Sequence, residues 1–367
     1  ASAVTMASTL AVTGNVDFNG DLDVDGTSNL DVIDVDGAAN FAADVTFADG
    51  ADIITASAGT SNFRAGVNAG NSIASGGNYN VVVGDEAGTA ITTGDLMTAV
   101  GYKALFTEDT GERSTAVGAY ALTLQNSAVE NYNTAVGYNA GGAVTTGIKN
   151  TLVGGLAGDS LTDADNNTAI GYLALSADTL GSKSTAIGQG TLFAQNFTSA
   201  TDAFNTAVGY LAGTAVTTGT HNTFIGGLAG DANTTGYYNV AVGASALSAN
   251  TTAISNTAVG YASLTANTTG ANNVALGANA LQPNTTGASN TAVGFSALDA
   301  NTTGGQNVAL GDNALGANTT ADYNTALGTS TLQLNTTGVN NVATGAFSLT
   351  ANTTGDNNVA MGYQALK

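Results

Sequence analysis

A glycine that in most repeats follows alanine and an aliphatic residue recurs along the chain at a nearly constant interval. We call these residues the core glycines: Gly84, Gly101, Gly118, Gly137, Gly154, Gly171, Gly188, Gly209, Gly226, Gly243, Gly260, Gly277, Gly294, Gly311, Gly328, Gly345 and Gly362. Fourteen of the sixteen intervals between them equal 17, and the other two equal 19 and 21. A fixed period of this length predicts a solenoid, in which each repeat forms one coil stacked on its neighbours.

The residues around each core glycine predict a short strand, two apolar walls and a turn. In the run from Asn273 to Gly277 the side chains alternate with a period of two, as in a strand. We expect the face carrying Val274 and Leu276 to point into the coil, because it holds the larger apolar side chains. The leucine four residues after the core glycine, as in Leu281, is expected to fill the opposite wall. The Asn-Thr-Thr-Gly stretch then supplies a turn, because Asn and Gly tolerate positive φ.

Two further positions of the repeat are nearly invariant. The residue four before the core glycine is asparagine in fourteen coils: Asn80, Asn133, Asn150, Asn167, Asn205, Asn222, Asn239, Asn256, Asn273, Asn290, Asn307, Asn324, Asn341 and Asn358. In a parallel, in-register stack these residues are expected to form a ladder of side-chain amide hydrogen bonds. The alanine two before the core glycine is expected to face outward, where its small size indicates that another surface packs against it. On this basis we expect several chains to associate around a common axis, as a homotrimer.

The N-terminal part of the chain, up to residue 63, follows a different pattern. Gly14, Gly20 and Gly26 are six residues apart, and ten aspartates fall within residues 17–52. Strands this short, with so few apolar residues, are expected to share one apolar axis between three chains. The sequence therefore predicts an acidic, glycine-punctuated and intertwined β-stalk over residues 1–63, a junction over 64–80, and a β-roll shaft of seventeen coils over 81–367.

Composition excludes several classes of function. The net charge is −21, from 27 acidic and six basic residues, so neither nucleic-acid binding nor adhesion to an anionic membrane is expected. There is no cysteine, and no apolar run approaches the roughly 18 residues of a membrane span, so membrane insertion is not expected either. His221 is the only histidine, and no paired carboxylates show a catalytic pattern. We expect no enzyme activity, no catalytic residue and no bound cofactor.

The repeat itself resembles known families. The runs at 256–261 (Asn-Thr-Ala-Val-Gly-Tyr) and 358–366 (Asn-Val-Ala-Met-Gly-Tyr-Gln-Ala-Leu) are similar to the N-T-A-V-G-Y-Q-A-L repeats of bacteriophage tail-fibre proteins. The same core is similar to the repeat in the β-roll heads of trimeric autotransporter adhesins. The resemblance covers nearly the whole chain. It implies a left-handed parallel β-roll in a homotrimer, with a role in adhesion or host attachment.

Some motifs suggest ligands. Asp21, Asp23 and Asp25, followed by Gly26, match the start of a calcium loop, but Val32 stands where the loop needs a bidentate glutamate. Outward-facing aspartates on a strand are the favoured interpretation, and calcium remains the alternative. The asparagines of the Asn-Thr-Thr segments are formal glycosylation sequons, for which the turn is the favoured explanation.

The two long intervals predict loops that protrude from the stack. Residues 119–136 add two residues, and residues 189–208 add four and carry Phe193, Phe197 and Phe204. Insertions in solenoids often lie on a binding face, so these three residues are candidate receptor contacts, and a seam between two blocks of coils is the alternative. Tyrosines that follow the core glycine, such as Tyr261, are expected to pack between coils or chains rather than against sugars.

The sequence thus predicts an all-β, elongated parallel β-roll or β-solenoid of 17-residue coils preceded by an intertwined β-stalk. We expect a structural fibre protein of a phage virion, a tail or side fibre that gives reach and attaches to a host surface. Its expected partners are sister chains, other virion or surface-fibre proteins, and a host-surface glycan or protein. A bacterial trimeric surface adhesin and a subunit of a polymerising extracellular filament are the alternatives. An ice-binding solenoid is disfavoured, because Tyr, Asp and Lys are expected to interrupt any flat threonine face.

Overall fold

The computed structural model describes residues 58–367, which fold as a parallel β-solenoid of eighteen stacked coils without any helix. The all-β solenoid of 17-residue coils predicted from the repeat is therefore confirmed. The strands are β1 (Phe63–Ala65), β2 (Val81–Val83), β3 (Thr98–Val100), β4 (Thr115–Val117), β5 (Thr134–Val136), β6 (Thr151–Val153), β7 (Thr168–Ile170), β8 (Gly181–Ser182), β9 (Thr185–Ile187), β10 (Thr201–Asp202), β11 (Thr206–Val208), β12 (Thr223–Ile225), β13 (Val240–Val242), β14 (Thr257–Val259), β15 (Val274–Leu276), β16 (Thr291–Val293), β17 (Val308–Leu310), β18 (Thr325–Leu327), β19 (Val342–Thr344) and β20 (Val359–Met361).

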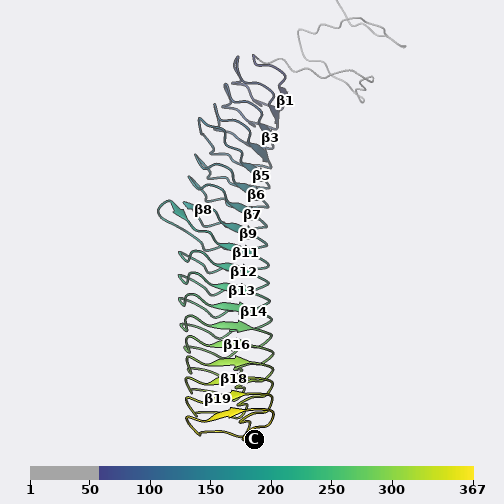
Figure 1. Ribbon diagram of the computed structural model, residues 1–367. Coiled ribbons are helices and arrows are strands. Elements are labelled where there is room, and N and C mark those ends of the chain that lie inside the picture. Colours follow the sequence, from purple (N-terminus) through teal and green to yellow (C-terminus); the bar gives the residue numbers. More distant parts are fainter. Residues whose placement is uncertain (1–57) are drawn as a thin grey trace, which may run out of the picture. The chain divides into compact units, whose positions relative to one another are not determined.

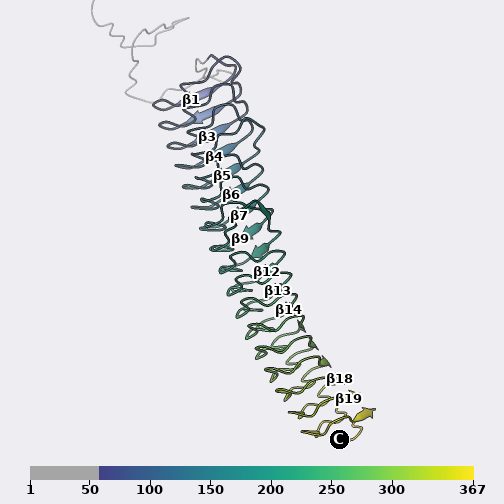
Figure 2. The same cartoon turned by 90° about the vertical axis from the view of Figure 1, so that its left-hand side faces the viewer.

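One strand of each coil pairs in parallel with the same strand of the next coil. Val274, Ala275 and Leu276 of β15, for example, lie beside Thr291, Ala292 and Val293 of β16. Eighteen strands form this sheet, and Figures 1 and 2 show them stacked as the rungs of one column. The strands β8 and β10 pair separately, outside the main sheet. Because β1 pairs with β2, the stack includes a coil within the range 64–80, and the predicted stalk lies almost wholly outside the described residues.

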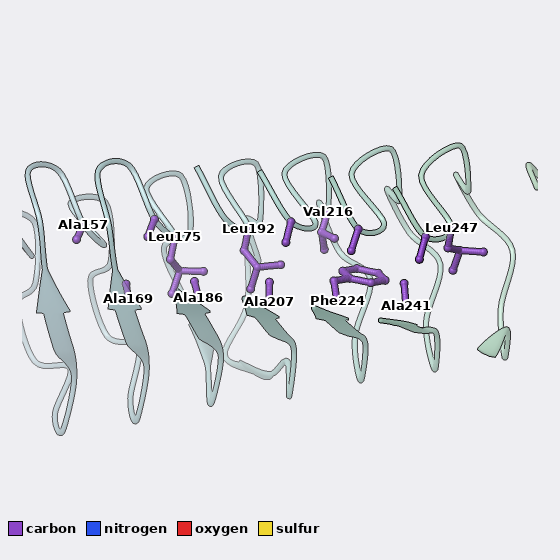
Figure 3. Close-up of a cluster of buried hydrophobic side chains, with 14 of the residues drawn as sticks. Ala157, Ala169, Leu175, Ala186, Leu192, Ala207, Val216, Phe224, Ala241 and Leu247 are labelled. Atoms are coloured by element: carbon purple, nitrogen blue, oxygen red, sulfur yellow. The ribbon is translucent and has the colours of Figure 1, made fainter. Parts of the chain in front are cut away.

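The side chains of each strand face the opposite way from our prediction. Ala275 is fully buried inside the coil, whereas Val274 and Leu276 are 38% and 46% exposed on the outside. The two walls of a coil lie close together, and Figure 3 shows alanines of the strands opposite Leu175, Leu192 and Leu247 of the facing wall. A small residue is needed on the strand because the leucine already fills the interior. The alanine therefore gives no reason to expect a neighbouring chain at that position.

Volume is conserved where a coil departs from this rule. The predicted leucine of the opposite wall is buried in the coils that have it, such as Leu281, except in the last coil, where Leu366 is exposed. Where glycine takes its place, the strand of the same coil or of the next coil carries a larger residue. Phe224, for example, occupies the alanine position, and a Cβ added at Gly213 or Gly230 would come within 2.8 Å of its ring. The coil interior is thus close-packed in two ways: alanine on the strand faces leucine on the opposite wall, or a larger strand residue faces glycine.

Each coil turns at fixed positions of positive φ. The core glycines have φ between +114° and +140°, and a Cβ at Gly294 would lie 2.6 Å from the carbonyl of Gly311 in the next coil. The Asn-Thr-Thr-Gly stretch bends without positive φ, contrary to our prediction. Its glycine instead permits close stacking: a Cβ at Gly287 would lie 2.3 Å from the carbonyl oxygen of Gly304. The left-handed residue follows two positions later, as at Ser289 with φ of 59°.

Asparagines line the interior in two rows rather than one. At the position four before the core glycine, the Oδ1 of Asn273 accepts the backbone N–H of Asn290, and its Nδ2 donates to the carbonyl of Gly287 at 2.9 Å. The predicted ladder residues Asn256, Asn273, Asn290, Asn307, Asn324, Asn341 and Asn358 share this pattern of bonds to the neighbouring backbone, wholly or in part. The second row is the sequon asparagines, whose Nδ2 groups donate to the Oδ1 of the preceding coil, as from Asn301 to Asn284 at 2.8 Å. Because Asn301 is buried, its amide is inaccessible to a glycan in the folded coil.

Candidate functional site

One corner of the solenoid carries a row of residues in left-handed backbone conformation. They stand five before each core glycine, or at the equivalent place in the first coil, and we call them the corner row: Ser61, Tyr79, Leu96, Arg113, Tyr132, Lys149, Asn166, Lys183, Phe204, His221, Tyr238, Ser255, Asn272, Ser289, Gln306, Tyr323, Asn340 and Asn357. Their φ values lie between 49° and 62°. Hydrogen bonds between coils hold the backbone there, as from the His221 N–H to the Ala203 carbonyl at 2.8 Å. The fold therefore imposes this conformation whatever the side chain.

The residue types in the corner row divide the shaft in two. From Ser255 onward they are Ser, Asn and Gln with one exception, Tyr323. Between Tyr79 and Tyr238 they are aromatic, basic or aliphatic with one exception, Asn166. A left-handed conformation costs a bulky residue about 1–2 kcal/mol and costs asparagine less. Strained residues of this kind gather at functional sites, so the bulky half of the row is the candidate functional surface.

The first enlarged coil, residues 119–136, places an ionic cluster on this row. The guanidinium of Arg113 pairs with Glu130 and, at 3.2 Å, with Glu112, and it lies 5.6 Å from the ring centroid of Tyr132. The hydroxyl of Tyr132 donates to Glu130 at 2.8 Å. These contacts lower the pKa of Glu130, through the Tyr132 hydroxyl and then Arg113, and raise the pKa of Tyr132, mainly because its proton is held by Glu130. The pKa of Arg113 is raised by Glu130.

The second enlarged coil, residues 189–208, repeats the arrangement with other residues. Lys183 pairs with Asp202 at 2.6 Å and lies 5.2 Å from the ring centroid of Phe204. In both coils a corner-row cation thus contacts a corner-row ring and an acid two residues before that ring. The loop around β8 and β10 that carries Asp202 stands out from the side of the column in Figure 1. Both enlarged coils therefore place a cation against an exposed carboxylate and an exposed aromatic ring, with the cation half-buried in the first cluster and exposed in the second.

Aromatic contacts continue from the second cluster toward the C-terminus. The rings of Phe204 and His221 have centroids 5.2 Å apart, and those of His221 and Tyr238 are 5.1 Å apart. Tyr237 meets Tyr238 edge to face at 5.2 Å. All four side chains are exposed. The next corner-row residue, Ser255, is small, so the ring series ends at Tyr238.

Buried polar networks support both enlarged coils. Glu108 accepts from Gln125 and Asn131 and from the backbone N–H of Gly111, and Gln125 also binds Ser114 and Asn133. The second coil has the same network, except that no equivalent of Asn131 binds the acid: Asp178, Gln195, Ser184 and Asn205 occupy the corresponding places. In both coils serine replaces the ladder asparagine, which leaves room for the longer glutamine. The shared networks, together with the match of residues 134–147 to residues 206–219 in twelve of fourteen positions, indicate an internal duplication of four coils.

The three candidate receptor contacts lie in different environments. Phe204 belongs to the corner row and is exposed, and Phe193 is exposed elsewhere on the same coil. Phe197 is only 5% exposed, and its backbone N–H donates to buried Asp178, so it packs the enlarged coil and is not available to a receptor. His221, expected to be a solvated turn residue, is exposed but stacks between two rings.

Sequence reasoning missed Arg113, Glu130, Tyr132, Lys183 and Asp202. The signal that could have found them is the concentration of bases: Arg113, Lys149 and Lys183 are three of only six in the chain, and all stand five residues before a core glycine. Tyrosines after the core glycine, such as Tyr261, are exposed. Tyr102 and Tyr120 do pack between coils, edge to face at 5.2 Å.

Within residues 58–367, no group of three or more acidic or histidine side chains is placed to hold a metal ion. The predicted calcium residues Asp21, Asp23 and Asp25 lie outside the described residues. No helix of the described part of the chain is long and apolar enough to span a bilayer. Searches of family models, curated proteins and solved structures found nothing that matches the chain.

Proposed function

We propose that the chain is a structural fibre protein of a phage virion, a tail or side fibre that assembles as a homotrimer, extends outward and attaches to a host surface. Each 17-residue repeat adds one rung of length, and coils of this kind are stabilised by their neighbours. The resemblance of the repeat to phage tail-fibre repeats supports the assignment to a virion. An exposed, aliphatic-rich face of the main sheet is the observation that carries the proposal.

The outer face of the main sheet carries no charged side chain from β2 to β20 and is rich in aliphatic residues. Two residues of each strand face outward, and from β2 to β20 these are only Thr, Val, Ile, Leu and Met. The aliphatic members include Val136, Ile170, Ile225, Leu276 and Leu310, each more than a third exposed in the single chain. Contiguous apolar patches of this extent are rare on monomeric proteins and mark association sites.

The size of this face suits association between copies of the chain. Eighteen strands at about 4.8 Å, each about 10 Å long, give a flat area of roughly 800 Å². A stable interface buries about 800 Å² on each partner, so the face is large enough for one. Sister chains are the fitting occupant, because each carries the same rows at the same spacing, and three copies around an axis cover three such faces.

A threonine array on the same face favours a second candidate function, ice binding. The outward residue before the buried one is threonine in eight consecutive coils, from Thr98 through Thr115, Thr134, Thr151, Thr168, Thr185 and Thr206 to Thr223. Our expectation that Tyr, Asp and Lys interrupt every flat face is wrong for this sheet. The two functions exclude each other at this surface, because a face buried between chains does not reach ice.

The mass of the particle in solution tests the proposal. We expect light scattering after size exclusion to give three times the 35.8 kDa chain mass. The double substitution Leu276→Lys and Leu310→Lys places two charges on the sheet face and is expected to yield a monomer with an unchanged circular-dichroism spectrum. Leu334→Lys, which charges an equally exposed leucine away from the sheet, is the control and should remain trimeric.

The alternatives give other outcomes. A monomer that retards the recrystallisation of ice, and loses this effect on Thr168→Lys, would support ice binding and contradict the fibre. Concentration-dependent filaments would support a polymerising subunit. Antibodies against residues 58–367 are expected to label virion tails, and labelling of bacterial surfaces alone would support an adhesin instead.

A further inference from the structure

We propose that the corner row at the two enlarged coils forms two copies of a binding site for a polysaccharide. This inference rests on the proposed attachment function and assigns it a place and a ligand class. The first copy is Arg113, Glu130, Tyr132 and Lys149, and the second is Lys183, Asp202, Phe204, His221 and Tyr238, with Tyr237 beside it.

Strain on the row is the first argument. Ser, Asn and Gln occupy it in six of the seven coils from Ser255 onward, where the side chain only has to tolerate φ near 60°. Tyr132 and Phe204 adopt the same conformation at a higher conformational free energy, with their rings exposed to solvent. Because neither ring fills the core, stability does not explain them, and recognition does.

The exposed chemistry fits sugars. Aromatic rings offer an apolar surface to the C–H face of a sugar, and Tyr238, 56% exposed at the end of the ring series, has only small Ser255 beyond it. Tyr237 meets this ring edge to face and forms a wall. Asp202 and Lys183 are paired with each other but remain about half exposed, so both can still bind hydroxyl groups.

Local charge selects against other ligands. Arg113, Lys149 and Lys183 are accompanied by Glu112, Glu130 and Asp202, so the row has no net positive charge to hold a polyanion. The chain as a whole carries −21. A hydroxyl-rich polymer of weak charge matches alternating rings, carboxylates and cations better than a nucleic acid does.

The duplication suits a repeating ligand. Tyr132 and Phe204 are four coils apart, or about 19 Å at the strand spacing. A polymer long enough to reach both copies gains affinity from the second contact, because that contact is intramolecular. A trimer would present the pair three times.

The test uses the full chain on an array of purified bacterial capsular and lipopolysaccharide-derived polysaccharides. We expect the wild type to bind at least one of them, and the double variant Phe204→Asn and Tyr238→Asn to lose about tenfold in affinity. Asparagine suits the left-handed conformation, so these changes should not unfold the coil. Tyr323→Asn makes the same change in the regular half of the row and is expected to bind as the wild type does.

A second variant separates the two copies. Tyr132→Asn alone is expected to weaken long polysaccharides while leaving the binding of short oligosaccharides at the second copy intact. The inference is overturned if no polysaccharide on the array binds, or if Tyr323→Asn reduces binding as much as the double variant. A chain that is trimeric and labels virions but binds no polysaccharide would remove this inference and leave the fibre in place. A chain that binds polysaccharide through Phe204 and Tyr238 but does not form trimers would support the binding site and contradict the trimeric fibre.

Discussion

The coils before and after about residue 222 share one wall and differ in the other. The strand wall is common to both halves, with alanine inside and Thr, Val, Ile or Leu outside in nearly all coils. The buried row seven after the core glycine differs. In the C-terminal half it is an unbroken series of asparagines: Asn233, Asn250, Asn267, Asn284, Asn301, Asn318, Asn335 and Asn352. In the N-terminal half it runs Ile91, Glu108, Gln125, Val144 and then Leu161, Asp178, Gln195, Val216.

This difference shows how one solenoid serves two purposes. An identical residue in every coil propagates the stack without change, which suits a spacer. An acid followed by glutamine lets the coil widen, because the carboxylate accepts backbone N–H groups of the larger loop, as Asp178 does from Gly181 and Phe197. The corner row follows the same division, with polar residues over the uniform half and rings and bases over the varied half.

The shared wall should respond equally in both halves, and here we expect the largest effect. Gly294→Ala and Gly137→Ala each force a side chain into φ near +135° to +140° and against the next coil's carbonyl. We expect each to destabilise its coil by about 3–5 kcal/mol, from backbone strain and overpacking. Gly227→Ala is the control, because no atom lies within 4 Å of the added Cβ. Hydrogen exchange on the flanking amides measures the loss of stability. If Gly137→Ala caused no loss while Gly294→Ala did, the two halves would not share this wall.

The buried row should distinguish the halves. Asn301→Leu leaves the Asn284 Oδ1 without its donor and the Asn318 amide without one of its acceptors. The Gly304 carbonyl loses one of its two side-chain donors and keeps the Asn290 Nδ2. We expect a loss of about 2–4 kcal/mol in a denaturant titration. Leu161→Met, at the equivalent place in the apolar part of the N-terminal half, should lose less than about 1.5 kcal/mol. Equal losses would contradict the division.

Glu108→Gln tests how the first enlarged coil is held. The substitution turns one acceptor oxygen into an amide. That amide faces either the backbone N–H groups of Gly111 and Ser127, which now bond Oε1, or the side-chain amides of Gln125 and Asn131, which now bond Oε2. We expect a loss of about 2–3 kcal/mol, concentrated in faster amide exchange at Gly111 and Ser127. Glu112→Gln changes a half-buried surface acid that pairs with Arg113 and does not bond the buried network, and it should have little effect on these amides. Unchanged exchange at Gly111 would contradict a supporting role for the carboxylate.

The corner row allows a reciprocal exchange of residues. Leu96→Asn relieves a left-handed leucine in the N-terminal half, and Asn272→Leu introduces one in the C-terminal half. We expect the first to stabilise and the second to destabilise, each by about 1 kcal/mol. Thermal melting of the two variants shows whether each is more or less stable than the wild type. If both destabilise, Leu96 has packing contacts that outweigh the backbone strain.

The smallest expected effect is a dependence on pH in the uniform half. Burial raises the pKa of Asp231, whose Oδ1 has no hydrogen-bond partner. Because the folded-state pKa exceeds the unfolded value, the penalty is absent below the unfolded pKa and appears as the pH rises through the folded pKa. Asp231→Asn should therefore be slightly more stable than the wild type at neutral pH and lose this advantage in acid. If Asp231→Asn were more stable than the wild type by the same amount at neutral and at acidic pH, the carboxylate charge would not be the cause.

The sequence predicted the architecture because a fixed period of 17 leaves few alternatives. It predicted the leucine wall for the same reason. The direction of the strand faces was wrong because hydrophobicity alone favours burying Leu276 over Ala275. The coil interior is too narrow for large residues on both walls, and this constraint is visible only when the two walls are seen together. The same constraint explains why the large ring of Phe224 on the strand lies against Gly213 and Gly230 on the opposite wall.

The candidate site was harder to predict, because its residues are scattered through the sequence. Arg113, Glu130 and Tyr132 come together only because two coils stack, and Lys183, Asp202 and Phe204 repeat the arrangement in the second enlarged coil. Protruding aromatics were a partial guide: Phe204 belongs to the site, whereas Phe197 packs beneath the loop. The left-handed conformation that marks the row leaves no trace in composition when Tyr or Lys occupies it.

A cryo-EM reconstruction of the full chain tests the central claim most directly, because it shows both the coils and what covers their sheet face. We expect rungs about 4.8 Å apart, one for each repeat, in three columns whose strands face a common axis. A single column with the Leu276 and Leu310 face open to solvent would contradict the trimeric fibre. Rungs that do not follow the repeat would contradict the solenoid itself.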